Sequence, residues 1–109
     1  MTEKSEKYLS DILMAIDLIE EFILGVDFIS YEKDRKTQSA VERQFSIIGE
    51  ALNQFKNIDP TITIENDKQI IGFRNRLIHA YDSLDNSMIW AILNRHLKCL
   101  KIEIENLIK

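Results

Sequence analysis

Side chains that could carry out acid–base and phosphate chemistry crowd one short stretch of the sequence. The stretch runs from Gly72 to Tyr81 and contains Arg74, Asn75, Arg76 and His79. Asn75 and His79 are four residues apart and can share one face of a helix, whereas Arg74 precedes His79 by five residues and is less well aligned. Arg74 and His79 can still point into one cleft if the helix ends near His79.

These residue types suit the cleavage of RNA through attack of its own 2′-hydroxyl on the adjacent phosphate. That attack needs a base, an acid and a cation to balance the charge that builds on phosphorus. Histidine titrates near neutrality and can be base or acid, and the fork of arginine matches phosphate oxygens. No metal is required on this route. A structural reading is also open, in which Arg74 and Arg76 form surface ion pairs, His79 caps a helix and Tyr81 packs over the core.

Composition limits the classes of protein that could use this chemistry. The chain has 109 residues, which predicts a single domain spanning residues 1–109. Hydrophobic residues make up 45% and charged residues 29%, the balance of a folded globular domain rather than a disordered chain. A formal net charge of -4 disfavours a protein that coats nucleic acid non-specifically, although it allows a local cationic cleft.

The numbers of cysteines and histidines limit the cofactors that the protein could hold. Together with the hydropathy of the chain, they also indicate its cellular location. Cys99 is the only cysteine, so no internal disulfide can form and the sequence fits a reducing compartment. One cysteine and two histidines are too few for a dedicated structural zinc site, and we expect neither a metal nor another cofactor. The first ten residues are polar, and no apolar run of about 18 residues occurs. We therefore expect a cytoplasmic protein that has no membrane partner.

Helical periodicity predicts the elements that must position the polar stretch. A first helix covers about Glu3 to Leu24 and stops at Gly25, followed by a loop that contains Phe28 and Tyr31. A second helix begins after the N-cap Asp34 and reaches about Phe55. Its core stripe, spaced in steps of four and three, is Val41, Phe45, Ile48, Leu52 and Phe55.

The second half of the chain predicts two more helices. A connection from Asn57 to Asn66 contains Pro60, and a shorter helix follows over about Asp67 to Ile78. Asp85 caps a last helix over about Asn86 to Ile108, with a core stripe of Ile89, Leu93, His96, Leu100, Ile104 and Leu107. His96 within that stripe is expected to be a core histidine rather than a second catalytic one. The pattern predicts an all-α antiparallel bundle of four main helices.

The sequence resembles a known family at the polar stretch and beyond it. Four residues separate Arg74 from His79, and one separates His79 from Tyr81. This spacing resembles the Arg-x4-6-His-x-Tyr signature of HEPN ribonucleases of the HepT type. Similar runs follow the family's order along nearly the whole chain: Asp34 to Gln38, Ala40-Val41, Ile47 to Ala51, Ile70 to Asn75, and Asp85 with Trp90. Phe73 and Ala80 depart from it, since the family often has Met and Gly there. Ala80 would be restricted if its backbone needed a positive φ.

The resemblance implies a site and an activity. Arg74 and His79 would be the catalytic pair of a metal-independent endoribonuclease, with Asn75 orienting His79 or the phosphate. By their charge alone, Lys68, Arg74 and Arg76 could serve an RNA backbone or form an ordinary solvated face. Glu50 could hold an arginine of the motif helix, although a solvated or otherwise paired Glu50 is equally open. Gly49 could let two helices approach closely. The family's enzymes usually work as homodimers whose two motifs face each other across one cleft.

The resemblance also implies a regulating partner. HepT-like proteins are toxins of type VII-like HEPN/MNT toxin–antitoxin systems, and their antitoxin is an MntA-like minimal nucleotidyltransferase that attaches AMP to the motif tyrosine. Tyr81 would be the acceptor, and the added bulk and charge would compete with RNA. Two alternatives stay open. Tyr81 could only pack or form a hydrogen bond, and the whole chain could be a non-catalytic helical module that dimerises or binds such a partner.

Overall fold

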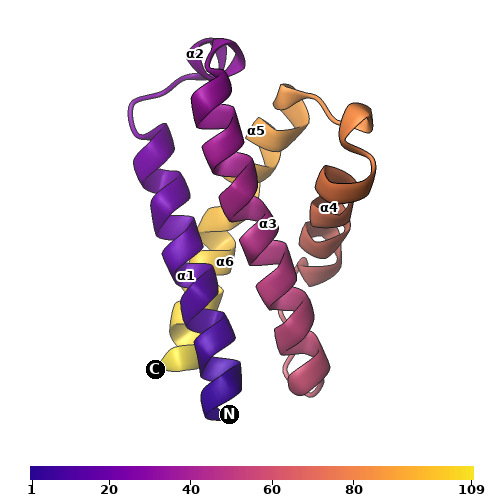
Figure 1. The fold of residues 1–109 in the computed structure, drawn as a ribbon. Coiled ribbons are helices and arrows are strands. Elements are labelled where there is room, and N and C mark those ends of the chain that lie inside the picture. Colours follow the sequence, from indigo (N-terminus) through magenta and orange to yellow (C-terminus); the bar gives the residue numbers. More distant parts are fainter.

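Four antiparallel helical segments make up the fold of residues 1–109 in the computed structural model (Figure 1). The segments are α1 (Glu3–Ile23), α3 (Arg35–Ile58), α4 (Asp67–His79) and the pair α5 (Asn86–Arg95) and α6 (Leu97–Ile108). The chain passes up through α1, down through α3, up through α4 and down through α5 and α6, so both termini lie at one end. The expected all-α bundle is confirmed, and no strand is present.

α3 is the central helix, and its apolar stripe forms the middle of the core. All five predicted stripe residues are buried: Val41, Phe45, Ile48, Leu52 and Phe55. α1 and α4 both pack mainly on α3, whereas α6 packs against α1. The buried side chains from all of these segments form one continuous core cluster. This arrangement makes α3 the platform against which α4, the helix of the motif, is positioned.

Local signals in the sequence set the ends of α1 and the start of α3. The Thr2 side chain accepts a hydrogen bond from the Ser5 backbone N–H at 3.1 Å and caps α1. Gly25 has a φ of 73°, the left-handed conformation expected just beyond a helix. The Asp34 carboxylate accepts from the Thr37 backbone N–H at 3.1 Å. The predicted stop and cap are therefore both confirmed.

The segment that was expected to be a loop around Phe28 and Tyr31 is instead a short helix, α2 (Phe28–Lys33). Asp27 caps it by accepting from the Ser30 backbone N–H at 2.8 Å. Tyr31 is fully buried, and its ring lies 5.0 Å from that of Trp90. Six residues are too few to be helical alone, so packing against α3 and α5 must stabilise this turn.

The single last helix predicted from Asn86 to Ile108 is divided in two at His96. This residue has a φ of -107° and ends α5, and α6 begins at Leu97. Leu97 is buried and takes the core position that periodicity assigned to His96, whose side chain is only half-buried. The exchange keeps an imidazole out of an apolar core, where it would need hydrogen-bond partners.

α4 is held by packing rather than by a local cap. Its N-cap residue Asn66 has a φ of 65° and makes no side-chain cap hydrogen bond. The helix buries Ile70, Phe73 and Leu77, and Phe73 meets Phe45 of α3 edge to face with ring centroids 5.1 Å apart. The departure from the family pattern at Phe73 is thus accommodated as a core residue.

No helix of the structure combines the length and the apolar character that a membrane span requires.

Candidate active site

Gly49 sets the distance between α3 and α4. It is buried, and a Cβ at this position would collide with Cβ and Cγ of Arg74. Because these atoms are at the root of the arginine side chain, they cannot move aside without moving α4. The close approach expected from Gly49 is confirmed, and it brings Arg74 directly over α3.

Arg74 is held by an ion pair with the next residue of α3. Its Nη2 lies 2.7 Å from Oε2 of Glu50, and its Nη1 donates to Oδ1 of Asn75 at 3.0 Å. Nε of Arg74 is buried and has no hydrogen-bond partner. Glu50 therefore receives the motif arginine as the sequence suggested. The two interactions fix the direction of the guanidinium, and Nε faces the protein interior rather than solvent.

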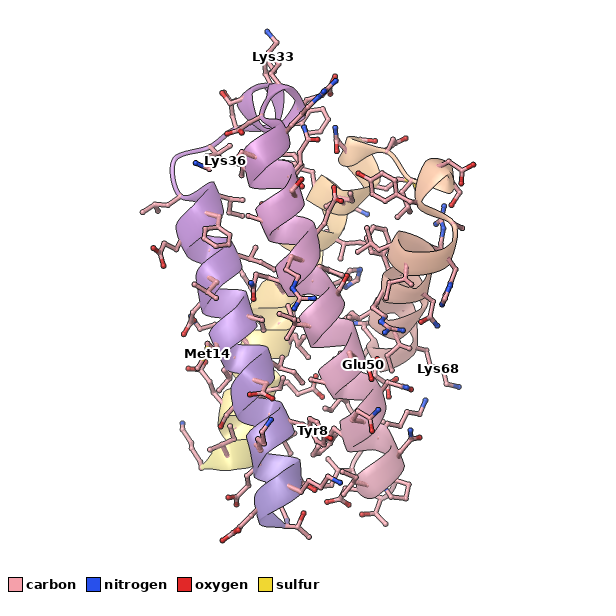
Figure 2. All side chains as sticks on the ribbon, viewed as in Figure 1. Tyr8, Met14, Lys33, Lys36, Glu50 and Lys68 are labelled. Atoms are coloured by element: carbon pink, nitrogen blue, oxygen red, sulfur yellow. The ribbon has the colours of Figure 1, made fainter.

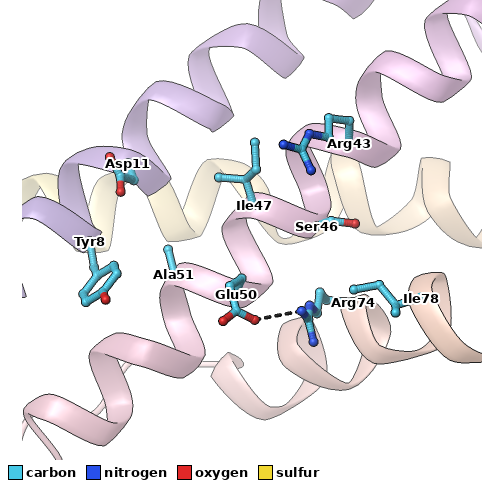
Figure 3. A pocket seen from close by; sticks show the side chains of 9 residues that line it. All are labelled: Tyr8, Asp11, Arg43, Ser46, Ile47, Glu50, Ala51, Arg74 and Ile78. Carbon is cyan, nitrogen blue, oxygen red and sulfur yellow. Dashed lines mark ion pairs between the residues drawn. The ribbon is translucent and has the colours of Figure 1, made fainter.

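A pocket of about 270 Å³ opens beside this ion pair, between α1, α3 and α4 (Figure 3). The residues that line it are Tyr8, Asp11, Arg43, Ser46, Ile47, Glu50, Ala51, Arg74 and Ile78. Figure 2 shows the same face of the molecule, with Tyr8 on α1 and Glu50 on α3. Arg43 is exposed and forms no ion pair, so it adds an uncompensated positive charge near Arg74. Sequence reasoning did not assign Arg43 or Ser46 to the site.

His79 lies outside this pocket. It is the last residue of α4, and its side chain is exposed and forms no hydrogen bond. Five residues of an α-helix turn by about 140° beyond a full turn, so Arg74 and His79 leave α4 in well-separated directions. Asn75, also exposed, lies closer to the direction of His79. One subunit therefore does not gather Arg74 and His79 into a single pocket.

Arg76 holds the turn that follows α4. Its Nη2 donates to the carbonyl oxygen of Ser83 at 2.9 Å, across the single turn of 3-10 helix η1 (Tyr81–Ser83). The backbone at Ala80 has a φ of -143°, so no positive φ is needed and alanine is not strained there. Arg76 acts here on the backbone of η1, which positions Tyr81.

Tyr81 is exposed, with 56% of its surface accessible, and its hydroxyl reaches back to α3. The hydroxyl donates to Oε2 of Glu42 at 3.4 Å. The negative charge of Glu42 raises the pKa of Tyr81, and burial raises the pKa of Glu42. Sequence reasoning did not single out Glu42. Glu42 precedes Gly49 by seven residues, or two helical turns, so both lie on the face of α3 that packs against α4. This spacing is the sequence pattern from which Glu42 could have been identified.

Further positive charge near the motif comes from Lys68, which is exposed at the start of α4 (Figure 2). No group of three or more His, Cys, Asp or Glu side chains is arranged to hold a metal ion.

Comparison with known proteins places this geometry in a family. Residues 12–107 of the chain match the family described as "Ribonuclease HepT-like". A protein of Thermococcus cleftensis named "Probable ribonuclease HepT" is 38% identical over 113 residues, which cover all of both chains. Two proteins of Methanocaldococcus jannaschii named as candidate RNases are also similar. One is 31% identical over 102 residues, covering 90% of this chain and 91% of its own. The other is 36% identical over 107 residues, covering 94% of this chain and 85% of its own.

No solved structure is significantly similar to this one. The family description covers nearly the whole chain, and the first of these relatives matches it from end to end. The motif residues follow one another along α4 and the turn after it, and Arg74 among them contacts Glu50 and Gly49 of α3. The chain belongs to the ribonuclease HepT-like family.

Proposed function

We propose that this protein is a metal-independent endoribonuclease in which Arg74 and His79 are the catalytic residues. The observation that supports this most is the placement of Arg74, which lines an open pocket and is held there by its ion pair with Glu50. His79 is exposed a short distance along the same helix. Relatives that match the chain over most of its length are named as ribonucleases.

The proposed reaction is an internal transesterification of RNA. The 2′-hydroxyl loses its proton to a histidine and attacks the adjacent phosphorus, the bond to the 5′-oxygen breaks, and an acid protonates that oxygen. The products are a 2′,3′-cyclic phosphate and a 5′-hydroxyl end. Arg74 stabilises the negative charge on the phosphate oxygens while the phosphorus has five ligands.

The divergent directions of Arg74 and His79 favour a site shared by two subunits. One subunit does not bring both groups to the same phosphate, whereas a second copy could place its His79 opposite Arg74 of the first. Ile78, which is 47% exposed, lines the pocket and directly precedes His79, so it supplies apolar surface for a second copy. We therefore propose a homodimer in which each phosphate meets Arg74 of one subunit and His79 of the other.

The test is cleavage of single-stranded RNA by the purified protein in the presence of a chelator. We expect the wild-type protein to cleave, and Arg74→Ala and His79→Ala to lose activity while they remain dimeric. Matched controls are Arg95→Ala and His96→Gln, which change the same residue types away from the pocket and should cleave normally. Intact RNA with the wild-type protein, or equal cleavage by all five proteins, would disprove the enzyme proposal.

We also propose that the protein is the toxin of a cytoplasmic toxin–antitoxin pair and that its nucleotidyltransferase antitoxin attaches AMP to Tyr81. The exposure of Tyr81 directly after the motif helix supports this, because an enzyme could reach the hydroxyl. Incubation with the partner and ATP should add mass in units of AMP. Tyr81→Phe should abolish the addition, and Tyr8→Phe should not.

A non-catalytic helical module is the second candidate. The ion pair that already occupies Arg74 and the mainly apolar pocket beside it favour this reading. A dimer that binds the partner but leaves RNA intact would identify this function.

A further inference from the structure

The contact between Tyr81 and Glu42 joins two elements that are far apart in the sequence. The donor is in η1 and the acceptor is in α3, 39 residues earlier. Glu42 forms no ion pair, and the only hydrogen bond to its carboxylate comes from Tyr81. A partly buried carboxylate whose sole partner is an exposed phenol is placed to accept the proton of that phenol.

We propose that Glu42 takes the proton from the Tyr81 hydroxyl when that oxygen is modified by a nucleotidyl donor. The inference rests on the modification of Tyr81 proposed above, and it names the group in this chain that activates the acceptor. The oxygen of Tyr81 forms a bond to the α-phosphorus of a nucleoside triphosphate. The bond from that phosphorus to the pyrophosphate breaks, pyrophosphate leaves with the electron pair, and the phenolic proton moves to Glu42.

The surroundings of Glu42 favour direct proton transfer over a pre-formed phenolate. The charge of Glu42 raises the pKa of Tyr81, so the phenol is less ionised than a free tyrosine. Burial raises the pKa of Glu42, which makes the carboxylate a stronger base. The Tyr81 phenol is therefore not ionised in advance, and the Glu42 carboxylate can remove its proton while the phenolic oxygen attacks.

Tyr31 is the third titratable group at this position. It projects from α2, its hydroxyl is buried without a hydrogen-bond partner, and burial raises its pKa, with further contributions from Glu42 and Tyr81. Tyr31 therefore stays protonated and cannot be the base. No lysine or arginine pairs with Glu42 to neutralise it, so the carboxylate is the one available acceptor.

The role of Glu42 can be tested without a partner protein. A small neutral arylsulfonyl fluoride reacts with a phenol when an oxygen–sulfur bond forms, fluoride leaves and a base takes the proton. The rates at Tyr81 and at Tyr8, whose hydroxyl has no carboxylate partner, are read by peptide mass spectrometry in one sample. We expect Tyr81 to react faster than Tyr8, and Glu42→Gln to slow Tyr81 on the order of 10²-fold while Tyr8 is unchanged.

Glu42→Gln is informative because the amide oxygen can still accept the hydrogen bond, so positioning is kept while basicity is lost. If Glu42 acted only through its charge, its removal would lower the pKa of Tyr81 and increase the rate. A faster or unchanged rate at Tyr81 in Glu42→Gln therefore overturns the proposal. Glu105→Gln, an exposed change on α6, is the matched control and should leave both rates unaltered.

A second arm uses the nucleotidyltransferase partner and ATP. Loss of AMP incorporation in Glu42→Gln, with normal incorporation in Glu105→Gln, supports the proposal. Equal incorporation in both variants overturns the role of Glu42 and leaves the modification of Tyr81 intact. If the wild-type protein accepts no AMP but the sulfonyl fluoride arm shows the expected loss, the proposed modification fails while the activation of Tyr81 by Glu42 stands.

Discussion

At the scale of the residue, Arg74 combines a structural contact with a proposed catalytic one. Its side chain is 22% exposed, and it pairs with Glu50, whose side chain is 45% exposed. Because water screens the charge of so exposed a carboxylate, the ion pair adds little to the free energy of unfolding. The main effect of the ion pair is to fix the direction of the guanidinium beside the pocket.

We expect Glu50→Ala to lower kcat for RNA cleavage roughly tenfold or more, because Arg74 loses the group that orients it. KM for RNA should stay the same or fall, since one negative charge facing the phosphates is removed. Steady-state kinetics with an oligoribonucleotide measure both parameters. An increase in KM at constant kcat would show that Glu50 instead supports RNA binding.

Residue types and spacing made Arg74 and His79 candidates but left a structural reading open, and the family resemblance favoured the catalytic reading and added Tyr81 and the supporting Glu50. Glu42 could not be identified in this way. Its importance depends on a contact to η1, and no local pattern specifies where the turn after α4 carries Tyr81. The direction of His79 was also beyond the sequence, because it depends on whether α4 continues to that residue.

At the scale of the element, the approach of α4 to α3 depends on a single glycine. We expect Gly49→Ala to lower the free energy of unfolding by roughly 1–3 kcal/mol, because the new methyl group displaces Arg74 and with it α4. Cleavage of RNA should fall in the same variant. Urea unfolding and RNA cleavage are the two measurements.

Gly72→Ala is the matched control for this prediction. A Cβ at Gly72 meets no atom within 4 Å, and the residue is inside α4. Alanine should therefore raise the free energy of unfolding by about 0.5–1 kcal/mol through helix propensity alone. Equal losses of stability at both glycines would contradict the account of Gly49.

Three helices begin at aspartate caps, which makes their stability sensitive to acid. Hydrogen bonds lower the pKa of each cap below 3.8: from the backbone at Ser30 for Asp27, from the Thr37 side chain for Asp34 and from the Ser87 side chain for Asp85. A lowered pKa in the folded state gives stability that is complete above the unfolded pKa and is lost as pH falls through the folded one.

We expect the triple variant Asp27→Asn, Asp34→Asn, Asp85→Asn to lose less stability than the wild-type protein between about pH 5 and pH 2.5. Asparagine still caps a helix but does not titrate in this range. Urea unfolding at a series of pH values gives the two slopes. Parallel slopes would mean that other carboxylates cause the acid sensitivity.

The interruption at His96 shows what periodicity leaves out. The apolar spacing from Ile89 to Ile104 is compatible with one helix, and no proline or glycine marks a break. Leu97 rather than His96 fills the core, and this choice depends on the helices that surround it. The helix α2 was missed for the same reason, since the burial of Tyr31 against Trp90 is a tertiary contact.

At the scale of the whole molecule, the proposed shared site makes the two subunits complementary. A mixed dimer joins one Arg74→Ala subunit to one His79→Ala subunit. One of its two sites then lacks both the guanidinium and the imidazole, and the other site contains both. We therefore expect co-refolded mixtures to recover part of the RNA cleavage that each inactive homodimer lacks. Variants that stay inactive when mixed, with mixed dimers verified by mass spectrometry, would place both catalytic groups in the same subunit.

The bundle itself was predictable because long amphipathic stretches, caps and a single connection at Pro60 allow few other arrangements. The surface that joins two copies was not, since exposed apolar residues such as Met14 and Ile78 have no sequence signature that separates a subunit contact from ordinary surface.

The missing cap at the start of α4 has a consequence for how the protein responds to heat. Asn66 gives this helix no side-chain hydrogen bond, and its burial rests chiefly on α3, so local opening there costs less than opening α1 or α3. We therefore expect the helix that carries the groups proposed to cleave RNA to open before α1 and α3. On heating, the rate of RNA cleavage should fall at temperatures where most of the helical content persists. Cooling should restore the cleavage.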